Sequence, residues 1–137
     1  MKKTRNNFIE LFEKCSEELK SLAFTHSSFA HDHNIESNER VEFLGDSVLS
    51  TIVSDYLYKH YHQQEGKMSK IRASFVCTAN LSELAKELGI ESNIKFGKSF
   101  KNKTISDSIL ADTIESMIGV MYLTYGCLLY TSDAADD

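Results

Sequence analysis

Two groups of carboxylates in this sequence could perform chemistry together. Glu39, Glu42 and Asp46 are spaced i, i+3 and i+7, and further along Asp112 and Glu115 are spaced i and i+3. Residues at these spacings share one face of an α-helix, so each group would present its acids together. If the two acidic faces meet, the convergence of like charges is strongly unfavourable until a cation neutralises it. Oxygen ligands without Cys or His favour a hard ion, Mg²⁺ or Mn²⁺, which can activate water and stabilise charge on a phosphoryl group.

Ordinary solvated surface is the alternative origin of both groups, because acidic pairs at this spacing are common on exposed helix faces. Two features favour a site. Gly45 directly precedes Asp46 in the middle of the first predicted helix. Glycine there costs about 1 kcal/mol relative to alanine, which suggests close approach by another backbone. Asp112 and Glu115 lie inside an otherwise apolar stretch, where a free charge is costly.

Other catalytic patterns fit the sequence less well. A di-iron bundle requires Glu-x-x-His, and neither acidic segment supplies the histidine. No G-x-x-x-x-G-K-[ST] motif is present, which excludes an ordinary P-loop NTPase. His26, His31, Asp32 and His33 could indicate a His/Asp phosphohydrolase, but we expect residues 31–37 to form a loop of solvated polar side chains.

Apolar periodicity predicts the helices that must position the carboxylates. The chain reads as an all-α domain of about six helices with no convincing strand. The two longest predicted helices carry the acids, and apolar residues recur along both at steps of three or four. Ser37 or Asn38 can cap the first of them. The predicted helices span residues 7–14, 17–25, 38–61, 69–88 (with or without a break near 78–80) and 107–125, with a turn at 63–67 and a basic loop at 90–104. The predicted buried stripe of the first long helix is Val41, Leu44, Val48, Ile52 and Tyr56.

Composition sets the outer limits of the interpretation. The chain has 137 residues with 42% hydrophobic and 26% charged side chains, which fits one globular domain. No apolar run reaches the roughly 18 residues of a membrane span, and the N-terminus does not read as an ordinary secretory signal. The three cysteines are odd in number and widely spaced, which predicts neither a zinc site nor a disulfide framework and favours a reduced, cytoplasmic compartment.

The distribution of charge is more informative than the net charge of −5. Basic residues gather at 59–72 and 95–103, whereas acids gather at 36–46 and 107–115. Such separation can hold a polyanion and a metal cation together, although each run could equally be a solvated face. The candidate nucleic-acid contacts are Lys70, Arg72, Lys98, Lys101 and Lys103.

Residues 38–49, N-E-R-V-E-F-L-G-D-S-V-L, resemble the signature of the ribonuclease III family. Residues 22–28, 65–73 and 109–119 agree with the family pattern in order, so the resemblance spans roughly residues 7–126. It implies an all-helical, homodimeric endonuclease that uses Mg²⁺, or Mn²⁺ in its place. No small-molecule cofactor and no membrane association are implied. The implied reaction is cleavage of double-stranded RNA, as in rRNA and mRNA precursor processing, to 5′-phosphate and 3′-hydroxyl ends.

The resemblance also implies residue roles. The implied metal ligands are Glu42, Asp46, Asp112 and Glu115, with Asp46 and Glu115 also catalytic. Glu39 and Glu65 match further acids of the family pattern and are expected to support the site. Phe43 matches an aromatic used in the subunit contact, and the alternative for Phe43 is a core position within its own chain.

Family members usually continue past residue 126 with another helix, and most bacterial members then add a double-stranded-RNA-binding domain. Residues 127–137 change character here, and we interpret them as a tail foreign to the family. The expected organisation is a catalytic domain at 1–126 without its final helix and without a double-stranded-RNA-binding domain. Loss of the final helix would uncover Met117, Met121 and Leu128. Two non-enzymatic alternatives stay open: a dimeric RNA-binding or scaffold module, and an inactive fragment. The presence of all four carboxylates favours the enzyme.

Overall fold

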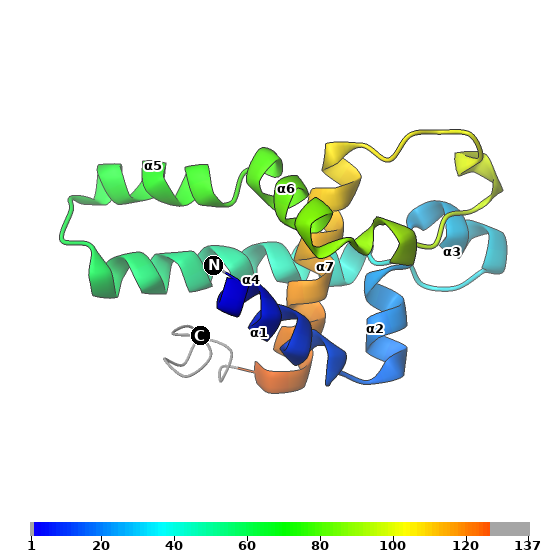
Figure 1. Cartoon of the computed structure of the whole chain (residues 1–137), viewed down its shortest axis with the longest axis horizontal. Helices are drawn as coiled ribbons and strands as arrows, with labels where there is room; N and C mark the ends of the chain where they lie inside the picture. Colours follow the sequence, from blue (N-terminus) through cyan, green and yellow to red (C-terminus); the bar gives the residue numbers. More distant parts are fainter. Residues whose placement is uncertain (1, 127–137) are drawn as a thin grey trace.

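The computed structural model describes residues 2–126 of the chain. Seven α-helices and two short 3-10 helices account for most of these residues, and the single β-bridge among them joins Thr25 to Lys95. The predicted all-α class is therefore confirmed. The elements are α1 (Lys2–Glu13), α2 (Glu17–Ala23), α3 (Ser27–His33), α4 (Glu39–His60), α5 (Glu65–Phe75), α6 (Thr78–Leu88), η1 (Ile90–Asn93), η2 (Lys98–Phe100) and α7 (Asp107–Tyr125) (Figure 1).

Helix α7 forms the centre of the core and crosses α4 (Figure 1). Its residues from Leu110 to Met121 are buried apart from the two acids in that stretch, which are half-buried. This helix is apolar on nearly all sides because it also packs against α6, α2 and α1. Ser106 caps its start by accepting a hydrogen bond from the Ile109 amide at 3.2 Å. The prediction of this helix at 107–125 is confirmed.

Helix α4 begins and ends within one residue of the prediction at 38–61. Of the two predicted caps, Ser37 accepts a hydrogen bond from the Glu39 amide at 3.2 Å. Asn38 instead docks the start of α4 onto the end of α2, because its side-chain amide donates to the Ala23 carbonyl at 3.1 Å. The N-terminal end of α4 is thus fixed against a second element of the core.

The apolar stripe of α4 departs from the prediction in its C-terminal half. Val41 and Val48 are buried as expected, but Tyr56 is 46% exposed and its neighbour Leu57 is buried instead. This part of α4 extends beyond α7 and pairs with α5 in a hairpin (Figure 1). Helix α5 has no fully buried residue. In the hairpin α4 therefore packs against α5 alone, and its buried face is narrower there than in the half that crosses α7.

Three segments predicted as irregular contain helix. The expected loop at 31–37 is partly wrong, because α3 runs to His33 and His26 caps it by accepting a hydrogen bond from the Ser28 amide. The turn expected at 63–67 is also only partly right: residues 61–64 are irregular, but α5 starts at Glu65, and Ser69 donates to the Glu65 carboxylate from inside the helix. The break near 78–80 occurs slightly earlier, between α5 and α6, and the basic loop contains η1 and η2.

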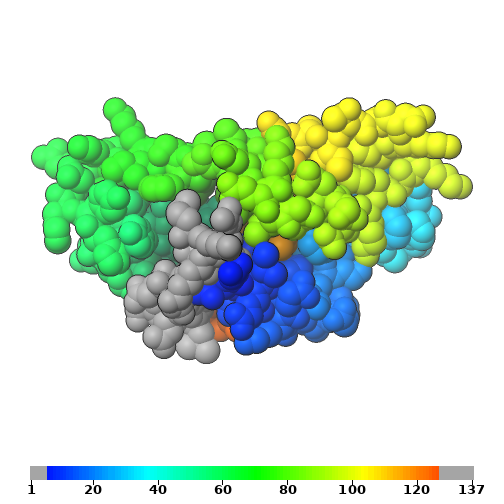
Figure 2. All heavy atoms as spheres, viewed as in Figure 1, coloured from blue at the N-terminus to red at the C-terminus, as the bar shows by residue number. Residues whose placement is uncertain are grey.

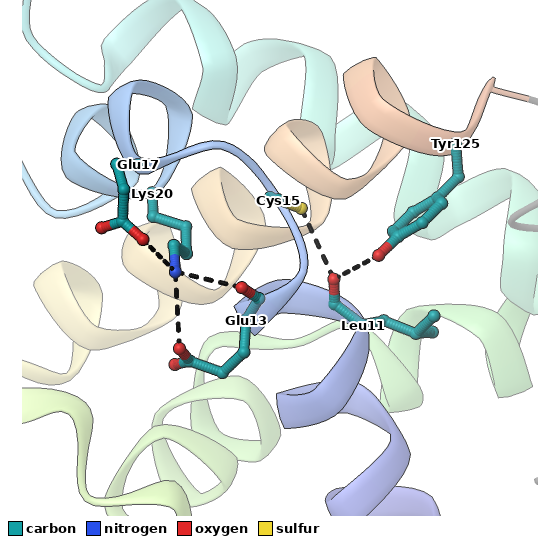
Figure 3. A network of polar contacts seen from close by, with 6 residues as sticks. All are labelled: Leu11, Glu13, Cys15, Glu17, Lys20 and Tyr125. Atoms are coloured by element: carbon teal, nitrogen blue, oxygen red, sulfur yellow. Dashed lines mark hydrogen bonds and ion pairs between the residues drawn. The ribbon is translucent and has the colours of Figure 1, made fainter.

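The C-terminal end of α7 is tied to the N-terminal helices. The Tyr125 hydroxyl donates to the Leu11 carbonyl at 2.6 Å, and the Cys15 thiol reaches the same oxygen at 3.5 Å (Figure 3). Met117 and Met121 are each only 2% exposed, so the expectation that these side chains would be uncovered is wrong. The proposed foreign tail at 127–137 lies outside the described residues. No helix in the part of the chain that the structure describes is long and apolar enough to cross a membrane.

Candidate active site

A pair of glycines lets α4 and α7 approach each other through their backbones. A methyl group built on Gly45 would lie 1.7 Å from the carbonyl oxygen of Glu115. A methyl group on Gly119 would lie 2.2 Å from the carbonyl oxygen of Val41. Neither position has room for a side chain, which confirms the close approach predicted from Gly45. The two helices are therefore in backbone contact at the level where both carry acids.

The carboxylates of the two helices converge at this crossing. Oxygen atoms of Glu42, Asp112 and Glu115 lie within 4.8 Å of one another, and all three side chains are half-buried. Asp46 is more exposed, and it lies close enough to Glu115 to raise the pKa of that carboxyl. Glu39 lies exposed in the first turn of α4, where its carboxylate accepts a hydrogen bond from Ser37 at 3.0 Å. The structure thus brings together three of the four predicted ligands, with Asp46 beside Glu115 at the edge of the cluster and Glu39 close to Glu42.

Burial and mutual repulsion perturb the acids of this cluster. Burial raises the pKa of Glu42 to about 7, helped by repulsion from Asp112 and a hydrogen bond to it. Burial likewise raises the pKa of Asp112, against the opposing effect of that hydrogen bond. Burial also raises the pKa of Glu115 to about 8, together with a hydrogen bond to Asp46 and repulsion from the other acids. Without a cation the cluster therefore holds protons near neutral pH.

One polar residue that the sequence did not single out, Ser116, connects the two acidic helices. The Ser116 hydroxyl lies 3.0 Å from the Asp112 carbonyl oxygen and 3.4 Å from the Asn38 carbonyl oxygen. It therefore bridges the first turn of α4 to the acidic part of α7. The available signal was a polar residue within the apolar stretch of α7, since a buried hydroxyl requires a partner.

His26 lies beside the cluster rather than within it. Burial lowers the pKa of His26, while the charges of Glu39 and Asp112 act in the opposite direction. Its Nδ1 atom accepts a hydrogen bond from the Ser28 amide, so the neutral ring caps α3. His31 and His33 are exposed on α3, and the alternative His/Asp phosphohydrolase site is not assembled among the described residues.

Other predicted site residues lie away from the cluster. Glu65 starts α5 at the far end of the α4–α5 hairpin and does not join the carboxylates of its own chain (Figure 1). Lys70 is exposed on α5, whereas Arg72 is half-buried and donates to the Ser54 hydroxyl at 2.8 Å. Phe43 is 78% exposed, so the alternative of a core position within the chain is wrong.

The three lysines of the basic loop that were predicted as nucleic-acid contacts are exposed at the other end of the molecule. Lys98 begins η2, and Lys101 and Lys103 follow it. The space-filling view shows this segment, in yellow, along the outer edge of the molecule next to α3 in cyan (Figure 2). No acidic residue interrupts residues 95–103.

The donor set of the cluster suits a hard divalent cation. The three clustered side chains and the neighbouring Asp46 all offer carboxylate oxygen, and neither Cys nor His contributes a ligand atom. The raised pKa values reflect burial first and then mutual repulsion, which a cation would relieve. These are the properties expected for Mg²⁺ or Mn²⁺ and not for zinc. The residues present therefore fit such an ion.

Comparisons with known proteins point to one family. The sequence profile described as Ribonuclease-III-like matches residues 16–130. The chain is 46% identical over 110 residues to Ribonuclease 3 of Halalkalibacterium halodurans, covering 76% of this chain and 42% of that protein. It is 48% identical over 104 residues to Ribonuclease 3 of Blochmanniella floridana, covering 74% of this chain and 43% of that protein. The chain thus spans less than half the length of these two curated relatives.

A solved structure is similar over nearly the whole chain. The nuclease domain of ribonuclease III from Campylobacter jejuni superposes with a TM-score of 0.79 at 30% identity, covering 95% of this chain and 92% of that one. The description of that structure concerns flexibility in a region involved in dimer formation. The sequence and structure comparisons therefore agree on the same family.

Proposed function

The chain belongs to the ribonuclease III family, and from that premise we propose that it is a divalent-metal-dependent endoribonuclease acting on double-stranded RNA. The observation that carries this proposal is the convergence of carboxylate oxygens of Glu42, Asp112 and Glu115 within 4.8 Å of one another. A half-buried acidic cluster is costly unless it serves a bound cation.

In this proposal the carboxylates of Glu42, Asp46, Asp112 and Glu115 hold Mg²⁺, with Mn²⁺ able to replace it. The bound ion supplies Lewis-acid stabilisation of charge on the phosphoryl group and lowers the pKa of water. Cation binding requires the acids to give up the protons that they hold near neutral pH. The resulting carboxylates are then all acceptors and can orient water.

Asp46 and Glu115 are the proposed catalytic pair. In this proposal one of the two carboxylates accepts the proton that the reacting water loses as its oxygen attacks phosphorus. The bond from phosphorus to the 3′-oxygen breaks, and that oxygen gains a proton. The products are a 5′-phosphate and a 3′-hydroxyl end. Because α4 and α7 are locked by backbone contact, both residues belong to rigid elements.

The RNA surface and the homodimer form the outer parts of the proposal. Exposed Lys98, Lys101 and Lys103 would contact phosphates, and Lys70 would extend the basic surface on α5. Phe43, exposed next to Glu42 on α4, would lie in a subunit contact. Glu39 and Glu65 are proposed to support the site, although Glu65 is remote from it within one chain. A cytoplasmic location and a role in rRNA and mRNA precursor processing stay predictions.

The proposal is tested by cleavage of a defined, end-labelled RNA duplex with Mg²⁺ and with chelator. We expect fragments with 5′-phosphate and 3′-hydroxyl ends with the metal and none with chelator. Glu115→Gln should lose activity, whereas Glu83→Gln, an exposed acid on α6, should retain it. Equal cleavage in chelator would contradict the proposed metal site, and binding without cleavage would favour the non-catalytic alternative.

A further inference from the structure

The basic segment, residues 95–103, is docked by backbone hydrogen bonds onto the short connection between α2 and α3. The Lys95 amide donates to the Phe24 carbonyl at 2.8 Å, and the His26 amide donates to the Lys95 carbonyl at 3.2 Å. These two bonds form the isolated parallel bridge between Thr25 and Lys95. These bonds therefore fix Lys95, the first residue of the basic segment, against the start of α3.

Two side chains of α3 accept hydrogen bonds from backbone amides of the basic segment. The Gly97 amide donates to the Ser28 hydroxyl at 2.8 Å, and the Lys98 amide donates to Asp32 Oδ2 at 2.6 Å. A methyl group built on Gly97 would lie 2.2 Å from the Ser28 carbonyl oxygen and 2.6 Å from Asp32 Oδ2. The close approach of α3 and the segment is thus possible only with glycine at this position.

Aromatic contacts connect the same segment to the side of the carboxylate cluster. Phe96 and Phe100 stack with their ring centroids 4.0 Å apart, and the His26 ring lies 4.9 Å from Phe96. The imidazole of His26 is also within electrostatic reach of Glu39 and Asp112. The lysines at and after η2 therefore have a fixed relation to the proposed catalytic centre.

Asp32 is an unexpected residue beside a surface proposed to bind phosphates. Its negative charge would repel an RNA backbone, so charge alone argues against it at this position. Its observed partner is the Lys98 amide, two residues past Phe96. We propose that Asp32, with Ser28, is a positioning residue that sets the basic segment in the orientation in which its lysines contact the phosphates of duplex RNA. This inference rests on the proposed function.

The test compares two substitutions that separate the charge of Asp32 from its hydrogen bond. Asp32→Ala removes both, whereas Asp32→Asn removes the charge and keeps an acceptor for the Lys98 amide. Binding of a blunt-ended RNA duplex is measured by fluorescence anisotropy with Ca²⁺ at several salt concentrations. We expect Asp32→Ala to weaken binding about threefold to tenfold with a smaller salt slope, and Asp32→Asn to bind as tightly as the unchanged chain or more tightly.

Cleavage with Mg²⁺ gives a second readout. Asp32→Ala should raise KM with kcat changed less than about twofold, because the carboxylates are untouched. Glu83 is an exposed acid on α6, and Glu83→Ala is the matched control, which should change neither KM nor kcat. Hydrogen exchange should show faster exchange of the Lys98 amide in Asp32→Ala than in Asp32→Asn.

Three results would overturn the inference. If Asp32→Ala bound RNA as tightly as the unchanged chain, the hydrogen bond from the Lys98 amide to Asp32 would be dispensable for binding. Equal weakening in both variants would show that the charge matters and not the acceptor. An unchanged salt slope after replacing Lys98, Lys101 and Lys103 by Ala would remove the segment from the RNA surface. In each case cleavage by the unchanged chain with Mg²⁺ would still support the proposed function. Failure of that cleavage alone would contradict the proposed function and not the positioning role of Asp32.

Discussion

The carbonyl oxygen of Glu115 occupies the space that a β-carbon on Gly45 would need. This contact makes the geometry of the carboxylate cluster a consequence of helix packing, because the residue that excludes a side chain on α4 is itself one of the proposed ligands. The acids of α4 and α7 cannot separate without breaking the most extensive helix contact of the core.

Replacing Gly45 by Ala should therefore damage both stability and the site. The added methyl group meets backbone atoms that cannot rotate away, so we expect a loss of about 1–3 kcal/mol or more in the free energy of unfolding. Chemical denaturation measures this loss, and Mg²⁺ titration should show weaker binding. Gly66→Ala is the matched control, because a methyl group there meets nothing within 4 Å. Equal stability of the two variants would contradict the packing argument.

Much of this arrangement was predictable from local pattern. The two long helices and the four acids followed from apolar periodicity and from spacing, and Gly45 indicated the close approach. The missed elements depend on contacts between distant residues. Helix α3 is polar and short, and its segment becomes ordered because Ser28 and Asp32 bind amides near residue 97. The exposure of Tyr56 similarly depends on where α7 stops covering α4, which periodicity within α4 does not report.

The metal-free chain should lose stability as the pH rises. Glu42 and Glu115 have pKa values of about 7 and about 8 in the fold, above the ordinary value of 4.5, so the folded chain binds these protons more tightly than the unfolded chain. That stabilisation is complete below the ordinary pKa and is lost as the pH rises through 7 and 8. We expect the melting temperature in chelator to fall from about pH 5 to about pH 8.5 and Mg²⁺ to reverse the fall at the upper end.

The control for this prediction is the same pH series with Glu115→Gln, which should show a shallower fall because one titrating group is removed. A melting temperature that rises from acid to neutral pH in chelator, with no effect of Mg²⁺, would show that other groups dominate and that the cluster holds no cation.

Neutralising one acid should separate catalysis from folding. Asp46→Asn or Glu115→Gln removes a proposed catalytic carboxylate while keeping its volume, so we expect cleavage to fall by at least about a hundredfold. Without metal, the melting temperature near pH 8 should stay the same or rise, because a repulsive charge is removed. Cleavage assays and calorimetry on the same preparations measure both effects. Unfolding of both variants would instead assign these acids a structural role.

The exposed ring of Phe43 supplies the last prediction, which concerns self-association. Phe43 is 78% exposed although it adjoins Glu42 in the core-forming half of α4, and a large apolar side chain gains about 1.5–3 kcal/mol when it is buried. If two chains meet at this ring, Phe43→Ala removes one such contribution from each chain and should weaken the dimer by at least about tenfold. Sedimentation velocity across a dilution series measures the change, and far-UV circular dichroism should show an unchanged fold. Tyr58→Ala is the matched control, since Tyr58 is equally exposed farther along α4. A Phe43→Ala chain that dissociates at the same concentration as the unchanged chain would place the subunit contact elsewhere.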